Sequence, residues 1–123
     1  MEKSIFEQII DGNIPSLKVF EDNKYIAILD INPKQKGHTL LIPKKKQENI
    51  LEDFDSQQDI LILASEIADK LKLKLGATGI KLVFNNGATA GQVVFHTHLH
   101  IIPYYENEVE AVNNEEVLSQ ING

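Results

Sequence analysis

One segment of this chain, residues 56–75, carries the repeat of a long amphipathic helix, and it constrains the fold more than any other feature. Its apolar residues recur at intervals of three and four, which places them on one face of a helix. They are Ile60, Leu63, Ala64, Ile67, Ala68 and Leu71. Asp55, with Gln58 three residues later, has the pattern of an N-cap, and Gly76 stands where a helix commonly ends. Such a helix needs a layer to pack against, and the other segments have to supply it.

The segments on either side of this helix have the pattern of short strands, because their apolar runs are bounded by turn residues or proline. Five strands are expected, at residues 17–21, 25–29, 38–42, 80–84 and 93–102. A short N-terminal helix is also predicted, where Ile5, Phe6, Ile9 and Ile10 recur at helical spacing behind Ser4. Short turns favour antiparallel pairing. The predicted class is therefore α+β: a five-stranded curved antiparallel sheet with one long helix and a short N-terminal helix.

The composition of the chain excludes several classes of function. The 123 residues are enough for one domain, and all 12 basic residues are lysines, against 18 acidic residues. Much of the net charge of −6 comes from a C-terminal tail without lysine, so no basic stripe is present to bind nucleic acid. No apolar run is long enough to span a membrane, the N-terminus lacks the apolar stretch of a secretory signal, and cysteine is absent. We expect a cytoplasmic protein with neither a membrane nor a nucleic-acid partner.

Three of the four histidines, His96, His98 and His100, alternate along the last predicted strand. Because side chains alternate between the two faces of a strand, these three imidazoles are expected to share one face. The residues between and around them, Phe95, Thr97, Leu99 and Ile101, are expected to face the core. A row of imidazoles loses solvation and repels itself when protonated, so it is a poor packing solution and indicates a functional site. The fourth histidine, His38, begins the third predicted strand.

Two chemistries fit such a row. Neutral imidazoles could bind zinc, or one imidazole could attack phosphorus while its neighbours orient it, hold phosphate oxygens and pass protons. Residues 85–92 favour phosphoryl chemistry, because their small residues let backbone N–H groups approach an anion and Asn85 and Gln92 add neutral donors. A metal site would more often place acidic partners beside its imidazoles, and this loop has none. The nucleophile is expected to be His98, which alone has an imidazole on each side.

The residues around the triplet resemble the signature of the histidine-triad (HIT) family. Residues 91–103 read Gly-Gln-Val-Val-Phe-His-Thr-His-Leu-His-Ile-Ile-Pro, which is His-x-His-x-His followed by two apolar residues. Residues 4–15, 25–33 and 37–44 are similar to other segments of the family, so the resemblance covers residues 3–104. It is closest to the branch of small nucleotide-binding phosphoramidases. It implies a HIT domain over residues 1–104, followed by an acidic tail over 105–123 that is partly ordered against a partner subunit.

The resemblance also implies an activity. Such proteins hydrolyse purine nucleoside phosphoramidates, adenosine 5′-monophosphoramidates among them, at the α-phosphate and through a nucleotidyl-histidine intermediate. In this chain His98 would be the nucleophile, His96 and His100 would position phosphate and assist proton transfer, and His38 would join the same network. No cofactor is expected. Dinucleoside polyphosphate hydrolysis, a non-enzymatic nucleotide-binding adaptor and a metal-binding module are the alternatives.

The same resemblance implies the contacts of the nucleotide. Asn85, Gln92 and the backbone around Val93 would contact the α-phosphate, and Asp30 would bind the ribose hydroxyls. The base pocket would be lined by Ile5, Phe6, Ile9 and Ile28. A homodimer is expected, since the family joins its sheets across a two-fold axis and an exposed sheet edge needs cover.

Two positions depart from the pattern of the family. Some members hold a structural zinc with residues that here read Ser4, Glu7 and Lys46. None of these three matches the expected cysteine and histidine ligands, so we predict no structural zinc. Many members also carry serine or threonine where this chain has Val93. Valine cannot donate a hydroxyl hydrogen bond near the phosphate, so only its backbone N–H could take that part.

Overall fold

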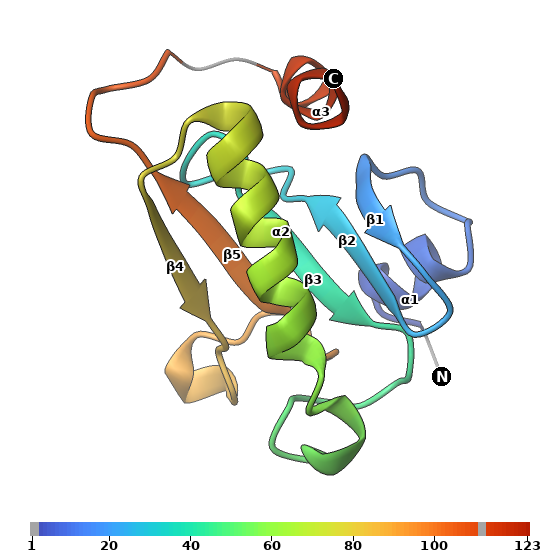
Figure 1. Cartoon of the computed structure of the whole chain (residues 1–123). Coiled ribbons are helices and arrows are strands. Elements are labelled where there is room, and N and C mark those ends of the chain that lie inside the picture. The colour runs from blue at the N-terminus through green and yellow to red at the C-terminus, as the bar shows by residue number, and fades with distance from the viewer. Residues whose placement is uncertain (1–2, 111–112) are drawn as a thin grey trace.

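The five strands lie in the order β1-β2-β3-β5-β4, and every neighbouring pair is antiparallel (Figure 1). This computed structural model describes residues 3–110 and 113–123. The elements are α1 (Ile5–Ile10), β1 (Lys18–Glu21), β2 (Tyr25–Leu29), β3 (Thr39–Pro43), α2 (Ile60–Leu75), β4 (Gly79–Val83), β5 (Leu99–Tyr104) and α3 (Asn114–Asn122). The predicted α+β class and curved antiparallel sheet are confirmed. Within the described ranges, no helix has the length and apolar character needed to cross a bilayer.

Helices cover both faces of the sheet, and this explains why every residue of β2 is buried. Alternate side chains of a strand enter different layers. Ala27 belongs to the core that includes Leu71 of α2. Ile26 belongs instead to a second core, in which it packs with Ile42 and with Phe6 of α1. The face under α1 is the one that carries the candidate site.

The long helix begins at Ile60, four residues later than predicted. Residues 55–57 form a separate turn of 3-10 helix, so the prediction that Asp55 caps the long helix is wrong. Asp59 stands at the N-cap, but its carboxylate accepts hydrogen bonds from the Tyr25 hydroxyl at 2.7 Å and from Lys24 at 2.8 Å. The prediction for the other end is confirmed, because Gly76 ends the helix with a φ of +81° that favours glycine.

The last strand begins at Leu99, so the prediction of a strand from residue 93 is wrong for residues 93–98. This segment bonds to the loop after β3 and not to a neighbouring strand: the Thr97 N–H donates to the carbonyl of Gln47 at 3.0 Å. The departure from strand geometry turns Phe95 outward, where it is 46% exposed, so its predicted core position is also wrong. Thr97, Leu99 and Ile101 are buried as predicted.

Pro103 lies inside β5, which continues to Tyr104, although the proline was expected to end the strand. Proline has no backbone N–H, but no hydrogen bond of the sheet is lost here. The carbonyl of Tyr104 accepts from Thr78 on the β4 side, so the backbone of Pro103 faces the β3 side. There the pairing with β3 has already ended at Ile101.

The acidic tail contains a helix, α3, which was not predicted from the sequence. Asn113 caps it by accepting from the backbone N–H of Glu116 at 2.9 Å. Val117 and Ile121 are buried in the core under α2. The helix packs against α2 and β1 of its own chain (Figure 1). Residues 111 and 112 of the tail lie outside the described residues.

Candidate active site

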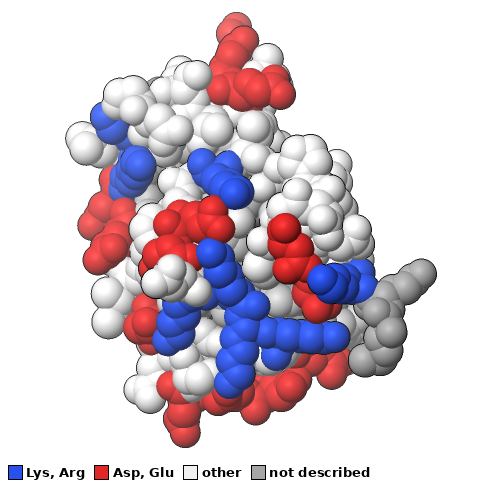
Figure 2. All heavy atoms as spheres, turned by 90° about the vertical axis from the view of Figure 1, so that its right-hand side faces the viewer, with Lys and Arg blue, Asp and Glu red and all other residues white. Residues whose placement is uncertain are grey.

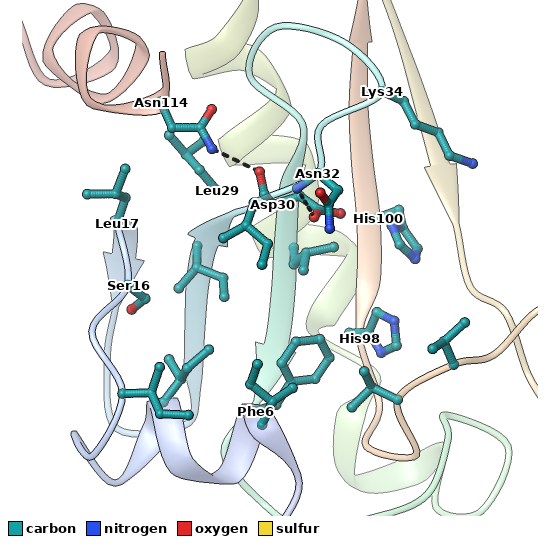
Figure 3. Close-up of a pocket in the computed structure, with 18 of the residues that line it drawn as sticks. Phe6, Ser16, Leu17, Leu29, Asp30, Asn32, Lys34, His98, His100 and Asn114 are labelled. Carbon is teal, nitrogen blue, oxygen red and sulfur yellow. Dashed lines mark hydrogen bonds between the residues drawn. The ribbon is translucent and has the colours of Figure 1, made fainter.

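A pocket of about 810 Å³ opens on the face of the sheet that α1 covers. One part of its wall is apolar and includes Phe6, Leu17 and Ile28. The other part is polar and includes His98 and His100. Figure 3 shows this division, with Leu17 on one side and the two imidazoles on the other. The arrangement suits a ligand with an apolar ring at one end and a polar reacting group at the other.

Most of the residues predicted to form the site line this pocket. They are Ile5, Phe6, Ile9, Ile28, Asp30, Asn85, Val93, His98 and His100. His38, His96 and Gln92 do not line it and are almost fully buried. The predicted set therefore divides into residues that a ligand can touch and residues that lie behind them.

The His98 ring is held with its Nε2 free. Its Nδ1 lies 2.8 Å from the carbonyl oxygen of His96. A carbonyl only accepts, so Nδ1 carries the proton and donates it. In the neutral ring Nε2 then keeps its lone pair. The ring lines the pocket and packs edge-on against Phe6, with 4.9 Å between ring centroids.

A chain of hydrogen bonds assigns the tautomers of His38 and His100 in the same way. The backbone N–H of Lys34 donates to Nδ1 of His38 at 3.1 Å, so the proton of the neutral His38 ring is on Nε2. That Nε2–H donates to Nδ1 of His100 at 3.0 Å. The neutral ring of His100 must then carry its own proton on Nε2. His100 lines the pocket, so this N–H is a donor available to a bound anion.

Burial keeps these rings neutral. It is the main cause that lowers the pKa of His98, and it lowers the pKa of His100 to about 4 with the help of the neighbouring His98 and His38. Burial also lowers the pKa of His38, although the Asp30 carboxylate opposes this. The lone pair of His98 Nε2 is therefore available at pH 7.

These shifts predict how stability depends on pH. The unfolded chain binds protons on its histidines near pH 6.5, whereas folded His100 binds one only near pH 4. Between these values the unfolded state holds more protons. The free energy of unfolding should therefore be undiminished by this group above pH 6.5 and fall as the pH drops toward 4. Urea denaturation of wild type and His100→Asn at pH 7, 6 and 5 gives the free energy of unfolding at each pH. This free energy should fall less steeply with decreasing pH in the variant. An equal fall in both proteins would contradict the lowered pKa of His100.

His96 and Gln92 support the site from behind. The Nε2–H of His96 donates to the carbonyl of Pro43 at 2.7 Å, and its own carbonyl holds His98. The side-chain amide of Gln92 donates to the carbonyls of Glu48 and Val94 and accepts from the N–H of Gly87. Both amide hydrogens of Gln92 are thus occupied. The structure leaves neither side chain facing the pocket, in contrast to their expected phosphate contacts.

Asp30, His38 and His100 offer a cluster of possible metal ligands, with one ligand atom from each within 4.8 Å of the others. However, the Nε2 of His38 and the Nδ1 of His100 are hydrogen-bonded to each other. A cation between them would have to displace the shared proton. Asp30 lies 3.6 Å from the His38 ring and accepts from the backbone N–H of Asn32. These contacts fit a proton network better than a metal centre.

The structure brings together the three residues that stand at the expected zinc positions. Ser4 and Glu7 form a reciprocal capping box at the start of α1. Lys46 lies 3.8 Å from the Glu7 carboxylate. An ammonium group has no lone pair for a metal, and the carboxylate is already engaged. The three side chains do not form a zinc-ligand set.

Several residues that line the pocket were not predicted. Lys34 and Ile31 come from the loop after β2, and Asn114 and Glu115 come from the start of α3. The Asn114 amide donates to the carbonyl of Asp30 at 2.9 Å. No local pattern in the sequence pointed to these residues, because their positions depend on how the loop and α3 pack against the sheet.

Comparison with known proteins gives a consistent picture. The family model described as HIT domain matches residues 11–107. An uncharacterized HIT-like protein of Methanocaldococcus jannaschii is 44% identical over 97% of this chain and 98% of its own. Adenylylsulfatase HINT3 of Arabidopsis thaliana is 40% identical over 85% of this chain and 53% of its own.

Solved structures give the same result for the fold. The crystal structure of a hypothetical histidine triad nucleotide-binding protein from Sulfolobus tokodaii superposes with a TM-score of 0.88. It is 35% identical in sequence, and the match covers 94% of this chain and 87% of that one. The likeness includes most of the chain, so it extends beyond the histidine segment to the whole sheet and its helices.

Proposed function

The chain belongs to the HIT family, and from this we propose that it hydrolyses purine nucleoside 5′-phosphoramidates at the α-phosphate through a nucleotidyl-histidine intermediate. The single observation that carries the proposal is the orientation of His98. Its Nδ1–H is given to a backbone carbonyl, and its free Nε2 lies at a pocket lined on one side by apolar residues. That is the arrangement a nitrogen nucleophile requires.

The nucleotide would lie across the pocket. Its base would contact the apolar wall formed by Phe6, Ile9 and Ile28, and its ribose hydroxyls would reach Asp30. The α-phosphate would then lie beside His98, with Asn85 as a neutral donor. Val93 is 84% exposed at the rim, so its backbone N–H can approach the phosphate although its side chain cannot donate.

In the first step, Nε2 of His98 attacks the α-phosphorus and forms a P–N bond, while the P–N bond to the substrate amine breaks. The electron pair of that bond leaves on the amine nitrogen, which needs a proton to depart. A solvent water can supply it and becomes hydroxide, while the Nε2–H of His100 donates a hydrogen bond to the phosphate oxygens. The substituted His98 ring becomes cationic, and its Nδ1–H bond to the carbonyl of His96 then stabilises the positive charge.

In the second step, water attacks the same phosphorus and the bond to His98 breaks. The electron pair of that bond returns to Nε2 of His98, the attacking water gives its proton to the hydroxide left by the first step, and the free nucleoside monophosphate leaves. The Nε2–H of His38 donates to Nδ1 of His100, so His100 keeps its own proton on Nε2 throughout the turnover. One difficult displacement thus becomes two easier ones.

A substrate panel tests the proposal. The protein should release amine and AMP from a fluorogenic adenosine 5′-phosphoramidate, with a rate that a chelator does not change. Binding of AMP without any turnover would overturn the proposal and support a nucleotide-binding adaptor. Turnover that is lost with chelator and restored by zinc would support the metal alternative.

We propose a homodimer joined at the β4 edge of the sheet. Among the described residues β4 pairs only with β5, so its other side presents backbone donors and acceptors to solvent. Leu82 on this strand is 44% exposed, which is unfavourable for an apolar side chain at a free edge. Sedimentation velocity should give a dimer for wild type and a monomer for Leu82→Glu. A monomeric wild-type protein would contradict the proposal.

A further inference from the structure

Lys34 is attached to the histidine network by its own backbone. It lies in the loop between β2 and β3, and its N–H donates to Nδ1 of His38. This bond fixes the position of the main chain beside the two rings of His38 and His100. The Lys34 side chain is exposed and lines the pocket. The loop therefore presents an ammonium group close to the reacting end of the pocket.

The charge of Lys34 is not neutralised by a neighbouring carboxylate. Six other lysines of the described residues form ion pairs: Lys3, Lys18, Lys24, Lys44, Lys45 and Lys46. Figure 2 shows lysines and acidic residues side by side in this way on one face of the molecule. Within residues 3–110 and 113–123, Lys34 has no carboxylate oxygen within 4.0 Å. After burial, which is the main cause, its positive charge also contributes to lowering the pKa of both His38 and His100.

The position of Lys34 relative to the pocket indicates which part of a substrate it can meet. In Figure 3, its side chain extends past His100 on the side away from Leu17 and Ser16. A nucleoside bound against the apolar wall, with its α-phosphate at His98, directs the group on the far side of the phosphorus toward Lys34. The chain has no arginine, so a lysine has to supply any side-chain cation at the point where a leaving group can carry charge.

We propose that Lys34 is a specificity-determining residue that contacts an anionic leaving group, a phosphate or sulfate oxyanion joined to the α-phosphate through a bridging oxygen. The inference rests on the proposed attack of His98 at the α-phosphorus. The Nε2–P bond forms, the P–O bond to the bridging oxygen breaks, and its electron pair leaves on that oxygen. Lys34 balances the negative charge that develops there, so the oxygen can leave without taking a proton. An uncharged amine gains nothing from this contact.

Paired substrates test the proposal. Wild type, Lys34→Ala and Lys34→Arg are compared on an adenosine 5′-phosphoramidate, on diadenosine tetraphosphate and on adenosine 5′-phosphosulfate. For Lys34→Ala we expect kcat/KM to fall about tenfold or more on the two anionic substrates, the size of one charged hydrogen bond. It should stay within about twofold on the amidate, and Lys34→Arg should recover most of the loss. A loss on only one anionic substrate would assign the contact to phosphate or to sulfate alone.

Lys36→Ala is the matched control, because Lys36 lies in the same loop and does not line this pocket. Alanine at position 34 keeps the backbone N–H that holds His38, so the histidine network should survive. An equal loss on the amidate and on the anionic substrates, or no loss on any of them, would overturn the proposal for Lys34. An equal loss in Lys36→Ala would overturn it as well, because the effect would then be one of general charge.

A binding measurement separates this proposal from the proposed enzymatic activity. By calorimetry, wild type should bind ADP more tightly than AMP, because the second phosphate lies where the leaving group would be. Lys34→Ala should bind the two nucleotides equally and keep its affinity for AMP. If wild type turns over no substrate, the proposed hydrolysis fails, and this comparison still decides the role of Lys34. An unchanged preference for ADP in Lys34→Ala would overturn the proposed role of Lys34.

Discussion

Replacing His98 with alanine is expected to lower kcat on an adenosine 5′-phosphoramidate by about 10⁴-fold or more, the scale seen when a nucleophile is removed. The free Nε2 of His98 is the group that forms the covalent intermediate, and no other described histidine presents an unprotonated ring nitrogen among the pocket-lining residues. His100 turns its protonated Nε2 to the pocket, and His38 lies behind it. The loss should therefore appear in kcat and not in the affinity for AMP.

Phe95→Ala is a suitable control for this variant. Phe95 belongs to the same segment, is 46% exposed and does not line the pocket, so its loss should leave the rate nearly unchanged. AMP binding to His98→Ala by calorimetry shows whether the pocket is intact. A rate for His98→Ala within tenfold of wild type would refute the covalent mechanism.

Removing the His38–His100 pair should produce the second largest effect. His100→Ala takes away the N–H donor that faces the phosphate and is expected to lower kcat by about 10²- to 10³-fold. His38→Ala should lower kcat by about 10²-fold, because Nδ1 of His100 then has no donor and the ring can adopt the tautomer that turns a lone pair toward the phosphate. His38→Gln retains an N–H donor and should recover part of this loss.

The double variant shows whether the two residues act as one unit. If His38 acts only through His100, then His38→Ala combined with His100→Ala should be no slower than His100→Ala alone. Steady-state kinetics of the four proteins, wild type included, give the coupling directly. Fully additive losses would mean that His38 has a separate role and that the hydrogen-bond relay is not the basis of its effect.

Where local and long-range signals agree, the sequence predicted the fold well. β2 matches its predicted bounds, and α1 forms behind Ser4 as expected, because burial and capping both act within a few residues of the chain. The start of α2 and the start of β5 could not be predicted from such signals. The Asp59 carboxylate binds Tyr25 and Lys24, and the Thr97 backbone binds Gln47, and both contacts come from distant parts of the chain.

In the candidate site, too, some features could be predicted from local sequence signals and others depend on contacts between distant parts of the chain. Spacing pointed to the triplet and the family resemblance added His38; the structure places His98 and His100 in the pocket wall, with His38 and His96 buried behind them. The sequence could not reveal that His96 and Gln92 lie behind the site, since their roles follow from the carbonyls they contact. It also could not reveal the tautomers, which depend on the carbonyl of His96 and the N–H of Lys34.

The contribution of α3 needed the structure for a different reason. Its apolar face is narrow, with Val117 and Ile121 as its buried residues, and the segment is otherwise polar. Asn113 followed by Glu116 is a local helix-start pattern, and the two residues do cap the helix. Nothing local shows that Asn114 then reaches back to Asp30 across more than eighty residues.

The most direct test of the central claim is to trap the intermediate. The protein is mixed with an adenosine 5′-phosphoramidate, quenched during turnover under alkaline denaturing conditions that spare phosphohistidine, and analysed by peptide mass spectrometry. We predict an adenylyl group on His98 in wild type, with a higher yield when hydrolysis of the intermediate is slowed, and no adduct in His98→Ala. An adenylyl group on another residue, or active wild-type enzyme that never carries one at any point in the first turnover, would contradict the mechanism.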